Sequence, residues 1–155
     1  MNAINIAYSD PSGRNVGIDV GSQQLDIFIH ELGKHWSTEN SAAGIKQLLS
    51  LLRRYKLARI LVEATGGYER QLVEACAVLG LPIVFVQPMQ VRQYAKAQGW
   101  MAKTDKLDST VIASFAAVMQ PEPRAIPWKN VRTFKDLLPR KRQLNEMRTQ
   151  ELNRH

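Results

Sequence analysis

The sequence predicts an α/β domain with a mixed β-sheet, in which an antiparallel meander precedes parallel strands and helices flank the sheet. Three short strand patterns follow one another between residues 15 and 40, and closely spaced strands pair as a meander. From residue 41 the apolar residues recur at helical spacing, and from residue 58 buried strand patterns alternate with helical ones. Strands that alternate with helices form a parallel sheet whose faces the helices cover.

The first strand of the meander is expected over residues 15–20, where apolar and other side chains alternate. One face carries the apolar set Val16, Ile18 and Val20. Gly17, Asp19 and Gly21 point the other way, and the two glycines leave room for an ion or a phosphate to approach Asp19, although a glycine at a strand end also makes turns. The second strand is expected in QLDIFIHE and the third near KHWSTEN.

The second half of the domain alternates helices and buried strands. Ser41 can cap a helix that runs to about Tyr55. The remaining elements are expected as the strand ARILVE, a helix from about Gly67 to Leu79, the strand LPIVFVQ, a helix opened by Pro88, and an apolar helix over roughly Asp105 to Met119.

Charge and proline content divide the chain into a flexible lead-in at residues 1–14, a domain at 15–120 and an extension at 121–155. Residues 121–127 hold three prolines, which mark a boundary, and the rest of the extension has apolar stripes typical of the start of a helical, coiled-coil segment that is cut short. The net charge is +7, and residues 121–155 carry nine Lys and Arg against four Asp and Glu. Such an excess favours a polyanionic partner, nucleic acid before membrane.

Four carboxylates are the candidate catalytic and metal-binding residues: Asp19, Glu63, Asp105 and Asp108. If the strands that carry Asp19 and Glu63 are parallel neighbours, both open onto the crevice where α/β sheets bind ligands. Asp105 and Asp108, three apart on one helical face, could close that crevice from the side. Two divalent cations would neutralise four carboxylates and could stabilise both oxygens of a displacement at phosphorus. Three of these acids also have an ordinary structural alternative, namely turn formation for Asp19 and helix capping for Glu63 and Asp105.

These residues resemble a known family. The order of VGIDVGSQQLDIFI, VEATGGYE and VQPMQVRQYAKAQGWMAKTDKLDS is similar to the DEDD transposases of the insertion sequence 110 family, which includes Piv-type invertases and bridge-RNA-guided recombinases. The resemblance covers nearly all of residues 15–155. It implies a RuvC-like, ribonuclease-H-type fold with Asp19, Glu63, Asp105 and Asp108 as the metal-binding tetrad.

The resemblance also implies Mg²⁺ as the natural ion, with Mn²⁺ as an alternative, and DNA as the substrate. A guide RNA and self-association through the C-terminal helical segment are further implied partners. Family members continue into a coiled coil and a second domain that carries a serine nucleophile, and neither is complete here. The chain is therefore expected to be the N-terminal portion of a bacterial, cytoplasmic DNA transposase or recombinase.

Basic and aromatic residues supply the candidate nucleic-acid contacts. Ahead of Asp105 these are Arg92, Lys96, Trp100, Lys103 and Lys106, and in the extension Arg140, Lys141 and Arg142. Such a mixture suits phosphate contact and base stacking, and its structural alternative is an ordinary solvated helix and loop. Cys76 lies among apolar residues on a helix and is expected in the core.

Two other functions compete with this interpretation. The chain could be a non-catalytic nucleic-acid-binding or assembly module, in which the acids only cap elements or bind ions. Gly-Ile-Asp-Val-Gly also resembles the first phosphate loop of actin-like ATPases, but that class needs two lobes and a second glycine-rich loop that this chain lacks. No stretch is apolar and long enough to span a bilayer.

Overall fold

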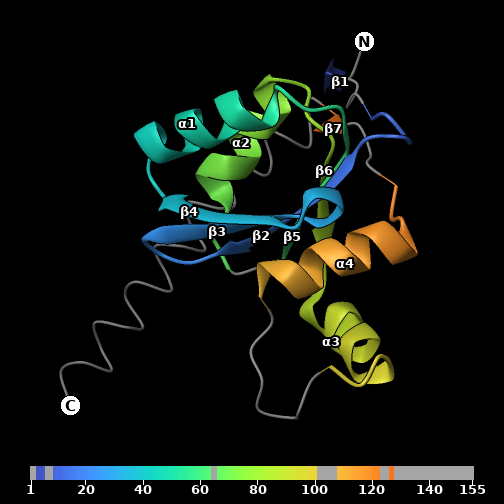
Figure 1. Cartoon of the computed structure of the whole chain (residues 1–155). Coiled ribbons are helices and arrows are strands. Elements are labelled where there is room, and N and C mark those ends of the chain that lie inside the picture. The colour runs from blue at the N-terminus through green and yellow to red at the C-terminus, as the bar shows by residue number, and fades with distance from the viewer. Residues whose placement is uncertain (1–2, 6–8, 64–65, 101–107, 123–125, 128–155) are drawn as a thin grey trace, which may run out of the picture.

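A computed structural model describes residues 3–5, 9–63, 66–100, 108–122 and 126–127. Its centre is a five-stranded sheet in the order β4-β3-β2-β5-β6 (Figure 1). The strands are β2 (Arg14–Val20), β3 (Gln24–Ile29), β4 (Lys34–Glu39), β5 (Leu57–Glu63) and β6 (Ile83–Val86). β2, β3 and β4 pair antiparallel, whereas β5 is parallel to β2 and β6 is parallel to β5. The predicted α/β class and mixed sheet are confirmed.

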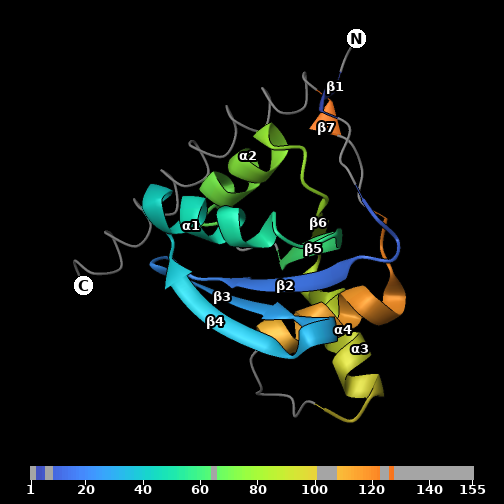
Figure 2. The same ribbon diagram turned by 45° about the horizontal axis from the view of Figure 1, so that its top comes forward.

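Helices cover both faces of this sheet (Figure 2). One face packs against α1 (Ala42–Leu52) and α2 (Arg70–Val78), and the other against α4 (Ser109–Met119), beside which lies α3 (Pro88–Ala97). The alternation in β2 explains the first layer, because Val16, Ile18 and Val20 all enter the core with α1 and α2. On the opposite face, Leu61 of β5 packs in a second core with Tyr94 of α3 and Ile112 of α4.

The helices begin at the signals that the sequence carries. The Ser41 hydroxyl accepts a hydrogen bond from the Gly44 amide at 3.1 Å and caps α1, and Pro88 occupies the first turn of α3. The start of α4 differs from the prediction. Asp108 has extended backbone angles and its carboxylate caps the Val111 amide at 2.9 Å, so the helix begins at Ser109.

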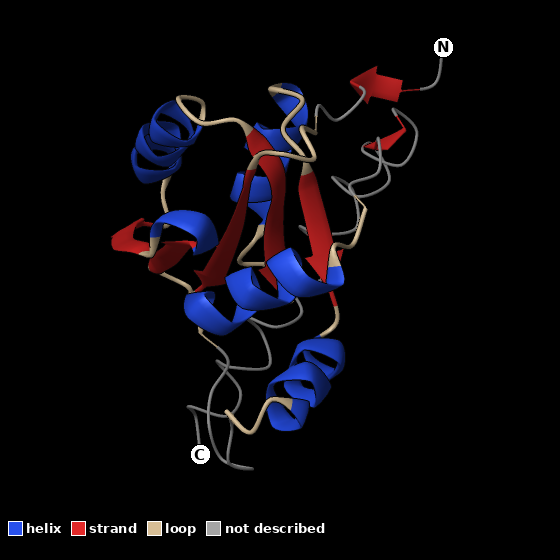
Figure 3. Ribbon diagram, turned by 45° about the vertical axis from the view of Figure 1, so that its right-hand side comes forward, coloured by secondary structure: helices blue, strands red, loops and turns tan. Residues whose placement is uncertain are grey.

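Two elements were not predicted. Residues 30–32 form a short 3-10 helix, η1 (His30–Leu32), between β3 and β4. Near the two ends of the described chain, β1 (Ala3–Asn5) pairs antiparallel with β7 (Ile126–Pro127), apart from the main sheet (Figure 3). None of the described helices is long and apolar enough to cross a membrane.

Candidate active site

Asp19 and Glu63 lie on adjacent parallel strands at the same end of the sheet. Ile18 of β2 is in register with Val62 of β5, so the next residues, Asp19 and Glu63, occupy neighbouring positions. Both lie on the face opposite the α1 and α2 core, because side chains alternate along each strand. The two strands are therefore the parallel neighbours that a shared crevice at their carboxyl ends requires. Asp19 and Glu63 are each half-buried, and each already interacts with its surroundings.

Helix α4 brings Asp108 to this end of the sheet, because α4 runs antiparallel to β2. The Ser109 carbonyl and the Ala113 amide lie over Gly17, where a Cβ atom would be only 2.4 Å from either. Further along α4, the Ala116 carbonyl lies at Arg59, which is in register with Asn15 near the start of β2. The N-cap residue Asp108 therefore lies beyond Gly17, at the carboxyl ends of β2 and β5.

The space at Gly17 has a different purpose from the one predicted. The sequence suggested that this glycine leaves room for an ion or a phosphate beside Asp19. In the structure the backbone of α4 fills that room, and a side chain at position 17 would push the helix off the sheet. Gly21 has the ordinary turn role, since its amide donates to the Gln24 carbonyl at 2.8 Å.

Asp108 does not lie on the helix as predicted, because it precedes the first helical residue, Ser109. Asp105 itself lies outside the described residues. Within the described ranges, no three His, Cys, Asp or Glu side chains lie close enough together to hold a metal ion. Asp19, Glu63 and Asp108 thus lie at the same end of the sheet, but they do not form a complete set of metal ligands. They offer oxygen atoms, the donors that Mg²⁺ prefers.

Asp26 is a further acid at this end of the sheet that was not predicted from the sequence. It is in register with Asp19 across β2 and β3, so it lies on the same face. The Ser37 hydroxyl donates to its Oδ1 at 2.5 Å and Gln24 Nε2 at 3.2 Å, while His35 Nε2 is 4.0 Å away. The signal was present in QLDIFI, where Asp26 alternates with the buried Leu25 and Ile27.

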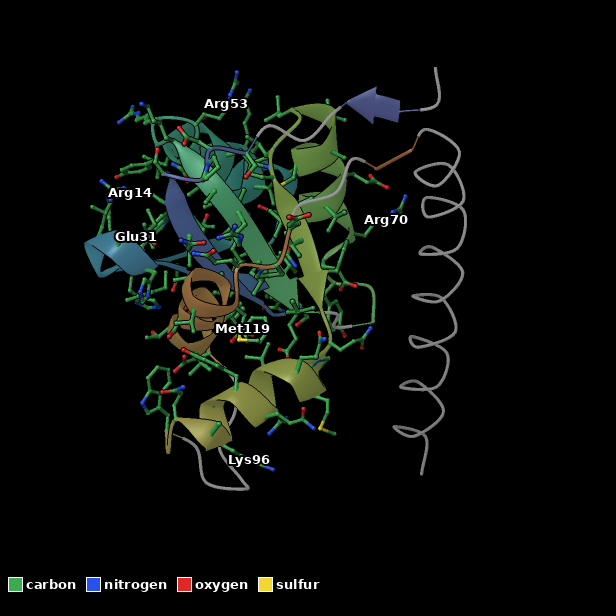
Figure 4. The ribbon with its side chains drawn as sticks, turned by 90° about the vertical axis from the view of Figure 1, so that its right-hand side faces the viewer. Arg14, Glu31, Arg53, Arg70, Lys96 and Met119 are labelled. Carbon is green, nitrogen blue, oxygen red and sulfur yellow. The ribbon has the colours of Figure 1, made fainter. Side chains whose placement is uncertain are left out.

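At the opposite end of the sheet, the buried side chains of Arg59 and Asn15, together with the exposed Glu31, hold the C-terminus of α4. Arg59 donates through Nη1 to Asn15 Oδ1 at 2.6 Å and through Nε to the Pro121 carbonyl at 3.0 Å. Asn15 in turn donates its amide and Nδ2 to the two carboxylate oxygens of Glu31, at 2.6 and 2.7 Å. We name this group, Arg59, Asn15 and Glu31, the Arg59 clamp. Figure 4 shows Glu31 on the side of the molecule away from Arg70.

The clamp alters the ionisation of its two charged members. Partial burial acts to raise the pKa of Glu31, but the hydrogen bonds from the Asn15 side chain and amide outweigh it, so the net pKa is below its ordinary value. Burial lowers the pKa of Arg59, and the charge of Glu31 opposes that shift. Arg59 remains a cation at neutral pH. α4 is thus fixed at Gly17 near one end and at the clamp near the other.

Three of the candidate nucleic-acid residues lie on or just after α3. Arg92 is half-buried and Lys96 is exposed, and Figure 4 shows Lys96 pointing away from the sheet. Trp100 is 51% exposed and meets the Tyr94 ring edge-on, with ring centroids 5.7 Å apart. The other candidates, Lys103, Lys106, Arg140, Lys141 and Arg142, lie outside the described residues.

Cys76 is a core residue. It is completely buried in the core between the sheet and α2, as predicted, and this burial raises the pKa of its thiol to about 12.

Comparisons with known proteins agree with the resemblance that the sequence motifs suggest. A family model described as a transposase, of the DEDD insertion sequence 110 type, matches residues 16–155. The pilin gene-inverting proteins of Moraxella lacunata and Moraxella bovis are each 25% identical to this chain over 112 residues, which cover 68% of this chain and 35% of the relative. The chain thus spans about a third of the length of these relatives.

A solved structure, T. thermophilus RuvC in complex with a Holliday junction substrate, has a TM-score of 0.48 and 18% identity to this chain, and the match covers 70% of this chain and 97% of RuvC. The family model, in contrast, matches all of the chain except its first 15 residues. The chain therefore belongs to the DEDD transposase family of the insertion sequence 110 type.

Proposed function

We propose that this chain is the metal-dependent catalytic domain of a DNA transposase or recombinase, in which Asp19, Glu63, Asp105 and Asp108 hold Mg²⁺ or Mn²⁺ and position a DNA phosphodiester. The observation that carries the proposal is the parallel register that makes Asp19 and Glu63 neighbours at the edge where α4 begins. Carboxylates that meet at the carboxyl ends of parallel strands occupy the usual ligand position of such sheets.

The residues of this edge have distinct tasks in the proposed site. Asp19 and Glu63 extend from adjacent strands, which gives their carboxylates a rigid base. Asp108 uses Oδ1 to cap the Val111 amide, so its second oxygen remains for an ion. The N-terminus of α4 adds a partial positive charge that favours an approaching phosphate. Bound divalent ions would stabilise the charge on the attacking and leaving oxygens of a displacement at phosphorus.

Titration calorimetry with Mg²⁺ and Mn²⁺ tests the metal assignment. We expect Asp19→Asn, Glu63→Gln and Asp108→Asn each to weaken binding, because each removes a charged ligand. Asp108→Asn is the sharpest variant, because asparagine caps helices as well as aspartate does and the start of α4 should be preserved. Asp10→Asn is the matched control, since Asp10 lies in the turn before β2, bound to Ser12.

Equal metal affinity in the wild type and in all three site variants would refute the proposed site. Weak binding of Mg²⁺ without DNA is expected, because Mg²⁺ keeps several waters and takes further ligands from substrate phosphates. Mn²⁺ therefore gives the more sensitive titration.

The activity of the intact protein is proposed from the family. We propose that this domain acts jointly with a serine nucleophile on a second domain, with a guide RNA and with a second copy joined through the C-terminal helical segment. Residues 1–155 alone should then produce no recombinant junction with a cognate element, whereas the intact protein should do so in a reaction that Asp19→Asn abolishes. Metal-independent DNA binding without any cleavage by the intact protein would instead support the non-catalytic module.

A further inference from the structure

A cavity of about 440 Å³ lies next to the carboxyl end of β2, on the side of α2. It is lined by polar and aromatic residues that follow β2, follow β4 and open α2, among them Ser22, Asn40, Tyr68 and Arg70. We call it the Tyr68 cavity. Ser22 is three residues beyond Asp19 along the chain, so their Cα atoms are at most about 11 Å apart. Nothing in the proposed metal chemistry uses these residues.

Asn40 contributes an acceptor that needs a donor. Its Nδ2 donates to the Gly21 carbonyl at 2.8 Å and to the Tyr68 carbonyl at 3.0 Å, which fixes which end of the amide is oxygen. The Oδ1 atom is buried, and no hydrogen-bond partner serves it in the described part of the chain. Buried polar atoms normally have a partner, so a donor from a water or a ligand would suit this position.

Tyr68 contributes an aromatic face. Its side chain is 49% exposed although its backbone is held in place by Asn40. The preceding Gly66 and Gly67 have positive φ values of 88° and 133°, a conformation suited to glycine, and the Gly67 amide donates to the buried carboxylate of Glu69 at 3.1 Å. An aromatic ring on a fixed backbone at the mouth of a polar cavity is a platform on which a flat ligand can stack.

Arg70 contributes a positive charge. Glu74 accepts from its Nε at 3.2 Å and so orients the guanidinium. Among the described residues the contact with Glu74 uses only Nε, so the terminal nitrogens of Arg70 suit the oxygens of a phosphate. Figure 4 shows Arg70 on the opposite side of the molecule from Glu31, far from the Arg59 clamp.

A nucleotide combines the three groups that this cavity would recognise: a flat base for Tyr68, N–H donors for Asn40 Oδ1 and a phosphate for Arg70. We propose that the Tyr68 cavity receives one unpaired nucleotide of the DNA strand whose phosphodiester lies at Asp19. The nucleotide must be unpaired, because the base faces and edges of a duplex are already stacked and paired. This inference rests on the proposed function, since it takes DNA as the strand at the crevice.

The test is a double-mutant cycle between Tyr68 and the DNA. Fluorescence anisotropy with Mg²⁺ measures binding of a short single-stranded DNA by the full chain, and each nucleotide in turn is replaced by an abasic one. We expect Tyr68→Ala to weaken binding about five-fold or more, and Tyr68→Phe to retain it, because the stacking face survives. One abasic position should cause a similar loss in the wild type and no further loss in Tyr68→Ala. Leu32→Ala, an exposed apolar change in η1, is the matched control.

Additive effects of Tyr68→Ala and of every abasic position would overturn the inference, as would wild-type affinity in Tyr68→Ala. The same cycle is repeated with RNA of the same sequence. Tighter binding of RNA than of DNA, with equal coupling between Tyr68 and the abasic position, would overturn the assignment to DNA. Failure of the proposed function has a separate signature, namely equal metal affinity in the wild type and in Asp19→Asn, Glu63→Gln and Asp108→Asn. If the site variants weaken metal binding but Tyr68 shows no coupling to any abasic position, only the proposal of a nucleotide in the Tyr68 cavity is rejected.

Discussion

Replacing Gly17 with alanine should separate α4 from the sheet and so disturb both stability and the proposed site. The added Cβ would lie 2.4 Å from the Ser109 carbonyl and from the Ala113 amide, and 2.9 Å from Ala113 Cα. All three are backbone atoms, so no side-chain rotation can relieve the contact. Favourable carbon contacts begin near 3.5 Å, so α4 must move by about 1 Å.

Overpacking of this kind costs about 1–3 kcal/mol, and we expect a loss near the upper value because rigid backbone meets rigid backbone. Urea denaturation followed by tryptophan fluorescence measures the free energy of unfolding. Gly33→Ala is the control, because Gly33 has φ 61° and no neighbour within 4 Å, so only backbone strain of about 1 kcal/mol is expected. If Gly17→Ala costs no more than Gly33→Ala, the close seating of α4 on β2 is wrong.

The same substitution should act on metal binding. Asp108 precedes α4 directly and would move with it, and a displacement of about 1 Å in a catalytic group can cost about 100-fold in activity. We therefore expect weaker Mn²⁺ binding by Gly17→Ala under conditions where it is still folded. Unchanged affinity would show that Asp108 contributes no ligand.

Three further predictions concern the clamp and the core. Arg59→Met should lower the free energy of unfolding by about 3 kcal/mol, because it leaves the buried Asn15 Oδ1 without its donor; urea denaturation within 1 kcal/mol of wild type would contradict this. Glu31→Gln should cost about 1 kcal/mol at neutral pH. Because the folded-state pKa of Glu31 is lowered, its contribution is present above the ordinary carboxyl pKa and is lost as the pH falls through the folded value, so acid titrations of the two proteins should converge there. Cys76 should resist a thiol reagent at pH 8 in the native protein and react fully in urea, and rapid native labelling would contradict its burial.

The strands were predictable from the sequence because the alternation of apolar side chains with other residues can be recognised even in short segments. The alternation of Val16 and Ile18 with Gly17 and Asp19 predicted both the strand and its faces. The parallel pairing of β2 with β5 comes from the structure, because β3, β4 and α1 lie between these strands in the chain. The start of α4 was not predictable to the residue, since Thr104, Asp105 and Asp108 can all cap a helix and only tertiary contact selects one.

The residues that depend on long-range partners were missed. Arg59 sits inside an apolar strand, and nothing local reveals that carbonyl groups at Ala116 and Pro121 will receive its hydrogen bonds. Asp26 became notable only through its register with Asp19. The acids of the candidate site were identified by type and order along the chain, which family resemblance supplies, whereas their distances depend on the packing of α4.

The pairing of β1 with β7 makes the domain suitable for circular permutation. Ala3 is in register with Pro127, so the described chain enters and leaves at one place. A short linker could join these two points, and new ends could be opened at Gly33, an exposed turn with open space around it. Such a circular permutant would keep every strand of the main sheet intact. It would also move the attachment point of any fused module from the β1 and β7 ribbon to the connection between β3 and β4, without altering the order of strands around Asp19.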